Sequence, residues 1–133
     1  MAENMPKVGL AVIIKKDSKY LLGKRKGSHD SGTWQFPGGH LEFFESLEDC
    51  AKREVKEEAG MVIANIKFLT ITNDFFKTDD KHYITIFMTA ESTEEPKLIE
   101  PEKCEGWQWF SLEEFPQPLF LPIENLIKQK GLK

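Results

Sequence analysis

At 133 residues the chain has the length of one domain with its own hydrophobic core, and we expect a single domain over residues 1–133. Its contents of 40% hydrophobic and 30% charged residues are typical of a globular protein, and no apolar run approaches the about 20 residues that a membrane-spanning helix requires. Its net charge of −4 argues against binding to duplex nucleic acid, which requires a basic surface, although a divalent cation can join an acidic protein to a polyphosphate.

The cysteines and the N-terminal segment indicate the compartment. Cys50 and Cys104 are far apart and form no CxxC pair, so we interpret them as reduced thiols rather than as a disulfide or a metal site. Residues 1–6 lack the basic and apolar regions of a signal peptide. We therefore expect a cytoplasmic protein without a membrane partner.

The first predicted elements are strands. Residues 8–14 are apolar and rich in β-branched side chains, which predicts a buried strand. After a polar turn, residues 20–25 predict a second strand that forms a hairpin with the first. Residues 27–32 have the composition of a loop, and a brief alternation at residues 33–36 ends at Pro37-Gly38-Gly39.

A helix comes next, with Ser46 as its expected N-cap and Gly60 as its expected C-terminal cap. The remaining predicted elements are strands at residues 61–72, 82–90 and 107–110, a solvated connection at 91–105, a short helical turn capped by Ser111, and an amphipathic helix at 119–130. This order predicts an α/β fold in which a mixed sheet is covered on both faces.

Three glutamates recur at helical spacing in the first predicted helix, Glu54, Glu57 and Glu58. At about 100° per residue, Glu54 and Glu58 fall close to an apolar stripe, where the helix meets the sheet; the stripe consists of Leu47, Ala51, Val55 and Ala59. Like charges four residues apart repel each other. A partly buried, self-repelling carboxylate pair requires a counter-charge, and a bound cation is the simplest one; the alternative is a solvated charged face.

Gly38 and Gly39 lie between a predicted strand and this helix. Without a Cβ, the backbone of such a turn can approach an anion closely, and a free carbonyl is a good ligand for a hard cation. Taken alone, the two glycines also fit an ordinary turn. Their spacing to the glutamate helix favours the first interpretation.

The segment from Gly39 to Met61 resembles the complete Nudix box of the MutT-like hydrolases. The matching positions are Gly39-x5-Glu45-x7-Arg53-Glu54-Val55-x-Glu57-Glu58-x-Gly60-Met61. The likeness extends over residues 8–127 and is closest to the nucleotide triphosphate diphosphatases, at segments 21–28, 37–42, 82–86 and 100–105. It implies a Nudix-type α/β/α sandwich that hydrolyses (deoxy)nucleoside triphosphates, including oxidised or modified ones, to a monophosphate and pyrophosphate.

The resemblance also implies a metal centre. It implies Mg2+, with Mn2+ as the alternative, held by Glu54, Glu57 and Glu58, with the Gly39 carbonyl as a further ligand. Some members of the family use one more glutamate from a loop outside the box. The candidates here are Glu102, which we prefer, and Glu105, and a solvated loop is the alternative for both.

We count Arg53 among the residues of the catalytic centre, but we expect it to support the structure of the site rather than to take part in the chemistry. It can pair with Glu57 at i+4 or reach back to Glu45, and the resemblance implies that Arg53 and Glu45 hold the loop and the helix together. Glu54 is also a candidate for orienting the attacking water. The sequence leaves open which glutamate is the general base.

The remaining expected contacts are with the substrate. The resemblance places Arg25 at the phosphates, with a surface Arg25 as the alternative. Gly38 and Gly39 allow a close approach of the phosphates, and His40, which follows them, is expected to polarise a phosphate, with a structural hydrogen bond as the alternative. The resemblance places Thr85 and Phe120 near the base.

One segment departs from the subgroup. Its base-contacting loop carries Trp-Gly where this chain has Leu121-Pro122, and a proline has no backbone N–H to donate. A pyrimidine nucleotide such as CTP or dCTP is therefore an alternative to guanine.

Two other functions stay open at this point. The same box serves enzymes that hydrolyse other nucleoside diphosphate derivatives, such as ADP-ribose or a dinucleoside polyphosphate. A non-catalytic nucleotide-binding domain is the second alternative, but such domains are expected to lose one or more of the box glutamates. A homodimer is expected from the resemblance alone.

Overall fold

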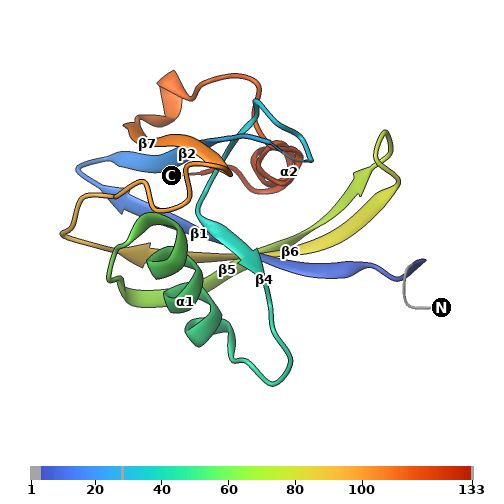
Figure 1. The fold of residues 1–133 in the computed structure, drawn as a ribbon, viewed down its shortest axis with the longest axis horizontal. Helices are drawn as coiled ribbons and strands as arrows, with labels where there is room; N and C mark the ends of the chain where they lie inside the picture. Colours follow the sequence, from blue (N-terminus) through green and yellow to red (C-terminus); the bar gives the residue numbers. More distant parts are fainter. Residues whose placement is uncertain (1–3, 28, 133) are drawn as a thin grey trace.

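The computed structural model describes residues 4–27 and 29–132, which form a mixed sheet with two α-helices (Figure 1). In chain order the elements are β1 (Lys7–Lys16), β2 (Lys19–Arg25), β3 (Trp34–Gln35), β4 (Gly38–His40), α1 (Leu47–Ala59), β5 (Ala64–Phe76), β6 (Lys81–Glu91), β7 (Cys104–Phe110), the 3-10 helix η2 (Leu112–Glu114) and α2 (Leu121–Gln129).

The strands join in the order β3-β2-β1-β6-β5, with β4 paired to β1 and β7 paired to β2. β1 and β6 run parallel, and the other pairs are antiparallel, so the sheet is mixed as predicted. The predicted β1–β2 hairpin is confirmed by the pairing of Lys15 with Tyr20. β4 pairs with β1 as well, and this contact brings the Gly38-Gly39 segment against the centre of the sheet.

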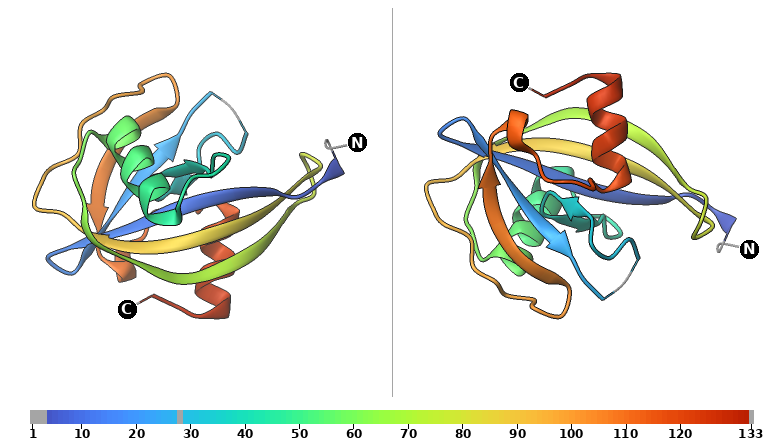
Figure 2. Two further views of the ribbon diagram at one scale, coloured as in Figure 1. Left: turned by 90° about the horizontal axis from the view of Figure 1, so that it is seen from below. Right: turned by 90° about the horizontal axis from the view of Figure 1, so that it is seen from above.

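The two helices lie on opposite faces of the sheet formed by β1, β5 and β6 (Figure 2). β1 contributes to both cores, because successive side chains of a strand point to opposite faces. Leu10, Val12 and Ile14 pack in the cluster beneath α1, whereas Ile13 packs in the cluster that contains Ile123 and Leu126 of α2. The predicted α/β/α sandwich is confirmed. Within the described residues, no helix is long and apolar enough to cross a membrane.

Both predicted ends of α1 are confirmed. The Ser46 hydroxyl accepts a hydrogen bond from the Asp49 N–H at 3.0 Å, and the Gly60 N–H donates to the Lys56 carbonyl at 3.1 Å. Gly60 has φ 63°, a left-handed conformation that a residue without Cβ adopts at little cost. α1 therefore starts and stops at positions set by its own sequence.

Several boundaries differ from the sequence-based expectation, and β7 begins at Cys104 rather than at residue 107. The predicted stop at Gly38-Gly39 is the strand β4. β5 begins at Ala64, because Met61 and Ile63 are buried against the α1 cluster before the strand starts, and it continues to Phe76. α2 begins at Leu121, since the Phe120 N–H donates to the Trp34 carbonyl at 2.9 Å and holds the preceding segment extended.

Removing the N-cap of α1 should destabilise the protein without altering the fold. In Ser46→Ala the Asp49 N–H loses its acceptor, and we expect the free energy of unfolding to fall by about 1 kcal/mol. Urea denaturation followed by circular dichroism measures this change. Ser46→Asp restores an acceptor and should remain close to the unsubstituted protein; an equal loss in both variants would contradict the capping role.

Candidate functional site

Except for Glu105, the sequence-predicted site residues line one cavity of about 860 Å3, between β4, α1, β6 and the start of α2. These are Arg25, Gly38, Gly39, His40, Arg53, Glu54, Glu57, Glu58, Thr85, Glu102 and Phe120. The cavity has an acidic end at α1 and an aromatic end near Phe76 and Phe120. This arrangement suits a ligand that has a charged part and a planar apolar part.

Glu54 is buried although it is ionisable, with 8% of its surface exposed. A Cβ added at Gly39 would overlap the Glu54 carboxylate, so only glycine allows the backbone and this side chain to approach so closely. Desolvation raises the pKa of Glu54, while Arg53, whose Nη1 donates to it at 2.9 Å, acts in the opposite direction. Glu54 therefore faces the cavity with its charge only partly compensated.

Glu58 lies one turn later on the same side of α1. The Gly38 N–H donates to its Oε1 at 3.0 Å. Burial nonetheless raises the pKa of Glu58 to about 8, and the nearby negative charges of Glu54 and Glu100 add to the effect. At neutral pH this carboxyl group thus retains its proton unless a cation lies close to it.

Arg53 is fully engaged by the protein itself. Its Nε and Nη2 donate to the two carboxylate oxygens of Glu45 at 2.7 and 3.0 Å, and Nη2 also donates to the His40 carbonyl at 3.0 Å. Its Nη1 reaches Glu57 at 3.2 Å. These bonds raise the pKa of Arg53 and lower that of Glu45 to about 2. Both predicted partners are bound, and the bidentate pair joins the β4–α1 connection to the helix.

The donor set of α1 fits a hard divalent cation. Glu54, Glu57 and Glu58 offer only oxygen atoms. The charge of Glu57 raises the pKa of Glu54, the charge of Glu54 raises the pKa of Glu58, and a nearby cation would counter both effects. Glu57 is the most accessible, with 54% of its side chain exposed. Within the described part of the chain, the three carboxylates do not all lie within 4.8 Å of one another, so direct binding of one cation by all three requires side-chain movement or a bridging water.

The acidic connection between β6 and β7 contributes two glutamates to the cavity, Glu100 and Glu102. Glu105, the other candidate, does not line it. Sequence reasoning missed Glu100, which is half-buried and close enough to raise the pKa of both Glu54 and Glu58. The signal was present in the chain, because Glu100 lies two residues before Glu102 in the segment that resembles the family.

The positively charged side chain of Arg25 lies at the aromatic end of the cavity. The Arg25 guanidinium lies 4.2 Å from the centre of the Phe120 ring, its Nε donates to the His29 carbonyl at 2.9 Å and its Nη1 donates to Gln35 at 2.6 Å. Desolvation lowers the pKa of Arg25. In the described residues no carboxylate lies within 4.0 Å of Arg25, so the guanidinium retains N–H groups for an anion in the cavity.

Thr85 reaches the cavity from β6, and its hydroxyl donates to Asp74 at 2.5 Å. Asp74 is fully buried on β5 and also accepts hydrogen bonds from Thr72 at 3.1 Å and from Asn125 of α2 at 2.9 Å. The Thr85 hydroxyl thus uses its proton in the hydrogen bond to Asp74, and its oxygen can accept a hydrogen bond from a ligand. Sequence reasoning did not find this network, because its members are far apart in the chain.

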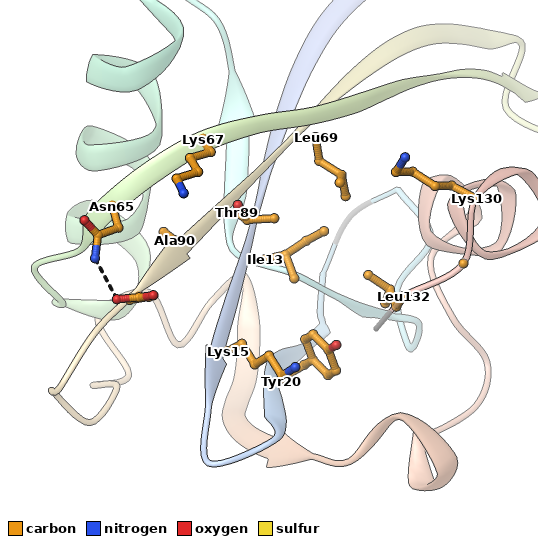
Figure 3. Close-up of a pocket in the computed structure, with 12 residues that line it drawn as sticks. Ile13, Lys15, Tyr20, Asn65, Lys67, Leu69, Thr89, Ala90, Lys130 and Leu132 are labelled. Carbon is orange, nitrogen blue, oxygen red and sulfur yellow. Dashed lines mark hydrogen bonds between the residues drawn. The ribbon is translucent and has the colours of Figure 1, made fainter.

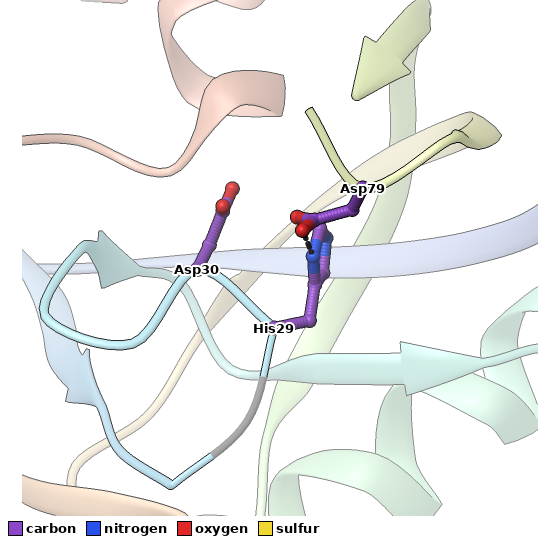
Figure 4. A group of neighbouring side chains, drawn as sticks. All are labelled: His29, Asp30 and Asp79. Atoms are coloured by element: carbon purple, nitrogen blue, oxygen red, sulfur yellow. Dashed lines mark hydrogen bonds and ion pairs between the residues drawn. The ribbon is translucent and has the colours of Figure 1, made fainter. Parts of the chain in front are cut away.

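Two histidines make structural contacts at the rim. His29 Nδ1 lies 2.7 Å from the Asp79 carboxylate at the β5–β6 turn, with Asp30 nearby (Figure 4). His40 Nε2 lies 2.9 Å from the Tyr83 hydroxyl, and desolvation together with the charges of two lysines lowers the pKa of His40. A neutral imidazole supplies hydrogen bonds rather than charge, which favours the structural alternative for His40.

A second cavity of about 690 Å3 lies near the C-terminal end of α2 (Figure 3). Its floor includes Ile13 and Leu132, and three lysines surround it: Lys15, Lys67 and Lys130. None of the predicted site residues lines this cavity. The acidic and glycine-rich cavity at α1 is therefore the candidate functional site.

The chain is similar to known proteins over most of its length. The NUDIX domain model matches residues 4–129. Over 57 residues the chain is 44% identical to an ADP-ribose pyrophosphatase of Methanocaldococcus jannaschii, covering 43% of this chain and 34% of that protein. Over 77 residues it is 32% identical to an 8-oxo-dGTP diphosphatase of Buchnera aphidicola subsp. Schizaphis graminum, covering 58% of this chain and 59% of that protein.

These matches therefore span less than two thirds of either relative. A solved structure agrees over a greater length. The MutT NUDIX hydrolase from Burkholderia pseudomallei superposes with a TM-score of 0.87 at 29% identity, covering 97% of this chain and 99% of that one. The fold, the geometry of the site and the family model all lead to one conclusion: the chain belongs to the NUDIX domain family.

Proposed function

We propose that the protein is a Mg2+-dependent pyrophosphohydrolase that converts nucleoside triphosphates to the monophosphate and pyrophosphate. The observation that carries this proposal is the meeting of the α1 glutamates with the Gly38-Gly39 backbone in one cavity, opposite Arg25 and Phe120. Members of the family generally use divalent metal ions. An all-oxygen donor set favours Mg2+, with Mn2+ as the alternative.

Each residue has a distinct task in this proposal. Glu54, Glu57 and Glu58 hold the cation, with the Gly39 carbonyl and Glu102 as further ligands. When bound, the cation neutralises phosphate charge and lowers the pKa of a coordinated water. Glu54, which is the most buried of the three, orients the attacking water.

The contacts with the phosphates and the base come from the other side of the cavity. Arg25, held over Phe120, directs its free N–H groups at the phosphate chain, and the Gly38-Gly39 backbone allows that chain to approach closely. The base lies against Phe120 and accepts or donates at Thr85.

The proposal includes substrates with either a purine or a pyrimidine base. Pro122 lies in the first turn of α2, so the backbone N–H that a guanine would use there is missing. The similarity to an ADP-ribose pyrophosphatase keeps hydrolysis of another nucleoside diphosphate derivative as the second candidate. A homodimer and a cytoplasmic location remain predictions from the sequence, and sedimentation velocity tests the first of these.

Pyrophosphate release should identify the reaction. We expect the purified protein with Mg2+ to release pyrophosphate from at least one member of a panel of ordinary and oxidised nucleoside triphosphates. Glu57→Gln and Glu58→Gln should each lower kcat by about 100-fold or more, because each removes a charged ligand. Glu48→Gln, an exposed carboxylate on the same helix, is the matched control. Full activity in either of the first two variants would refute the metal-site assignment.

The buried Glu58 should give the metal-free protein an unusual pH dependence. Its pKa rises from 4.5 to about 8 on folding, so the folded state retains a proton that the unfolded state has lost. The free energy of unfolding should therefore fall as pH rises from 4.5 to 8, with no further fall from this group above that range. Chemical denaturation in a chelator measures the slope. Glu58→Gln should reduce it, and an unchanged slope would show that Glu58 is not its source.

The pair of Arg53 and Glu45 should act as a unit. Arg53→Lys preserves the charge but cannot form two parallel bonds with Glu45, and we expect at least about a tenfold loss of activity. Glu45→Gln should lose a similar amount, and the double variant should lose little more than either single one. Steady-state kinetics at saturating metal measures the losses. Fully additive losses would show that the two side chains act independently.

A further inference from the structure

The second cavity, at the C-terminal end of α2, has the sheet as its floor (Figure 3). Ile13 of β1 is the register partner of Thr89 of β6, which is in turn the register partner of Lys67 of β5. Register partners point to the same face of a sheet, so these three side chains lie side by side along the floor. Leu69 of β5 adds apolar surface. The floor thus combines apolar side chains with a hydroxyl and an ammonium group.

The chain that follows α2 closes one side of this cavity. The N–H groups of Lys130 and Gly131 both donate to the Leu126 carbonyl, at 2.9 and 3.1 Å. Gly131 has φ 83°, a left-handed conformation that turns the chain back toward the sheet. Leu132 is therefore buried in the same apolar cluster as Ile13. This turn leaves Lys130 beside the cavity.

Three lysines reach the cavity from three parts of the chain: Lys15 of β1, Lys67 of β5 and Lys130 after α2 (Figure 3). We call it the lysine cavity. Each lysine is exposed, and in the described residues no carboxylate lies within 4.0 Å of its ammonium group. Glu91, the one acidic residue among the described residues that line the cavity, instead accepts a hydrogen bond from Asn65 at 2.7 Å. Three like charges thus lie around one cavity without a paired carboxylate, in a chain whose net charge is −4, and an anion would stabilise them.

Tyr20 presents an unpaired hydroxyl to the lysine cavity. Its side chain is only 4% exposed and packs edge-on against Phe115, with ring centres 5.7 Å apart. In Figure 3 the ring lies beside Lys15, whose Nζ is 5.7 Å from the ring centre. Among residues 4–27 and 29–132, no group forms a hydrogen bond with the Tyr20 hydroxyl, although a buried phenol usually has a partner. The hydroxyl is not enclosed in the core, so it opens to the cavity and can donate to a ligand.

The lysine cavity is separate from the candidate functional site. No residue of the described chain lines both cavities. Phe120 and Ile123, near the start of α2, line the cavity of the glutamates, whereas Lys130, after the end of α2, lines the lysine cavity. The charges that surround the two cavities also differ in sign at their closest counterparts, glutamates on α1 and lysines here. The hydrolysis proposed above gives the lysine cavity no task.

We propose that the lysine cavity binds a small phosphorylated organic anion. This proposal is independent of the proposed function. Lysine ammonium groups bind phosphate as point charges, whereas the planar recognition of a carboxylate favours arginine, and no arginine is among the described residues that line this cavity. A phosphate monoester carries close to two negative charges at neutral pH, which suits three cations.

The other features of the lysine cavity suit the organic part and the size of such a ligand. Ile13, Leu69 and Leu132 offer an apolar surface for the organic part, while the hydroxyls of Tyr20 and Thr89 can donate to the phosphate oxygens. The volume of about 690 Å3 falls within the range of about 300–1,000 Å3 that is usual for small-molecule sites.

Phenyl phosphate, which joins a phosphate to an apolar ring, is the probe for this proposal. We titrate it into the full 15N-labelled chain in a chelator and follow the backbone amides by NMR, so that no bound metal recruits phosphate to the α1 glutamates. The largest shifts should occur at Lys67, Thr89 and Gly131 rather than at Gly38 and Gly39. Inorganic phosphate, which lacks the ring, and benzoate, which carries a single charge, should each bind at least about fivefold more weakly.

Two sets of variants test the residues of the lysine cavity. Lys67→Ala combined with Lys130→Ala removes two of the three cations, and Kd for phenyl phosphate should rise at least about fivefold. Tyr20→Phe keeps the ring and its packing, and loss of the hydroxyl alone should raise Kd at least about twofold. Lys77→Ala combined with Lys128→Ala is the matched control, because it removes the same charge from exposed positions that do not line the cavity. Its Kd should change by less than about twofold.

Shifts at the lysine cavity, together with weaker binding in the cavity variants alone, would support the proposal. Shifts confined to the cavity of the glutamates, or the absence of any shift, would overturn it. An equal loss of affinity in the two double variants would also overturn it, since net charge would then explain the binding. Benzoate or inorganic phosphate binding as tightly as phenyl phosphate would overturn the ligand class. Pyrophosphate release with Mg2+ tests the proposed function separately, so each proposal can fail without the other.

Discussion

The site depends on how closely the backbone of β4 lies between β1 and α1. A side chain at Gly38 would overlap the Leu10 carbonyl, and one at Gly39 would overlap the Glu54 carboxylate. Two glycines in succession are therefore what allows the acidic face of α1 to contact the sheet. This contact removes water from Glu54 and Glu58 and so raises the pKa of both carboxyl groups. A nearby cation would stabilise their charged forms. Packing and the proposed metal affinity would thus arise from the same close approach.

Negative and positive charges lie at opposite ends of the cavity. Arg53 donates most of its hydrogen bonds to Glu45 and to the His40 carbonyl. Its positive charge therefore compensates the negative charge of the α1 glutamates only in part. Arg25 lies at the opposite end with no carboxylate in salt-bridge range among the described residues. Under the proposed function, this distribution of charge would orient a polyphosphate and its cation along the cavity.

Local features of the chain were sufficient to predict α1 and its glutamates, because the caps at Ser46 and Gly60 and the apolar stripe lie within a single segment. The mixed sheet followed from the order of the elements. Contacts between distant segments were not accessible in this way. Asp74 meets Asn125 only after β5 and α2 have packed together, and His29 meets Asp79 only across the mouth of the cavity. The start of α2 was misplaced for a similar reason, since a bond to the Trp34 carbonyl keeps Phe120 out of the helix.

The double role of β1 has a consequence for how this protein can diversify. Val12 and Ile14 support the helix of the glutamates, while Ile13 supports the helix that follows Phe120. A change of volume in β1 is therefore felt at both ends of the cavity at once, and such positions tolerate little variation. In the segment from Leu119 to Pro122, Leu119 packs in the same cluster as Ile13, whereas Phe120 and Leu121 are only partly buried. Substitutions at these two partly buried positions can therefore alter the base end of the cavity with less effect on β1.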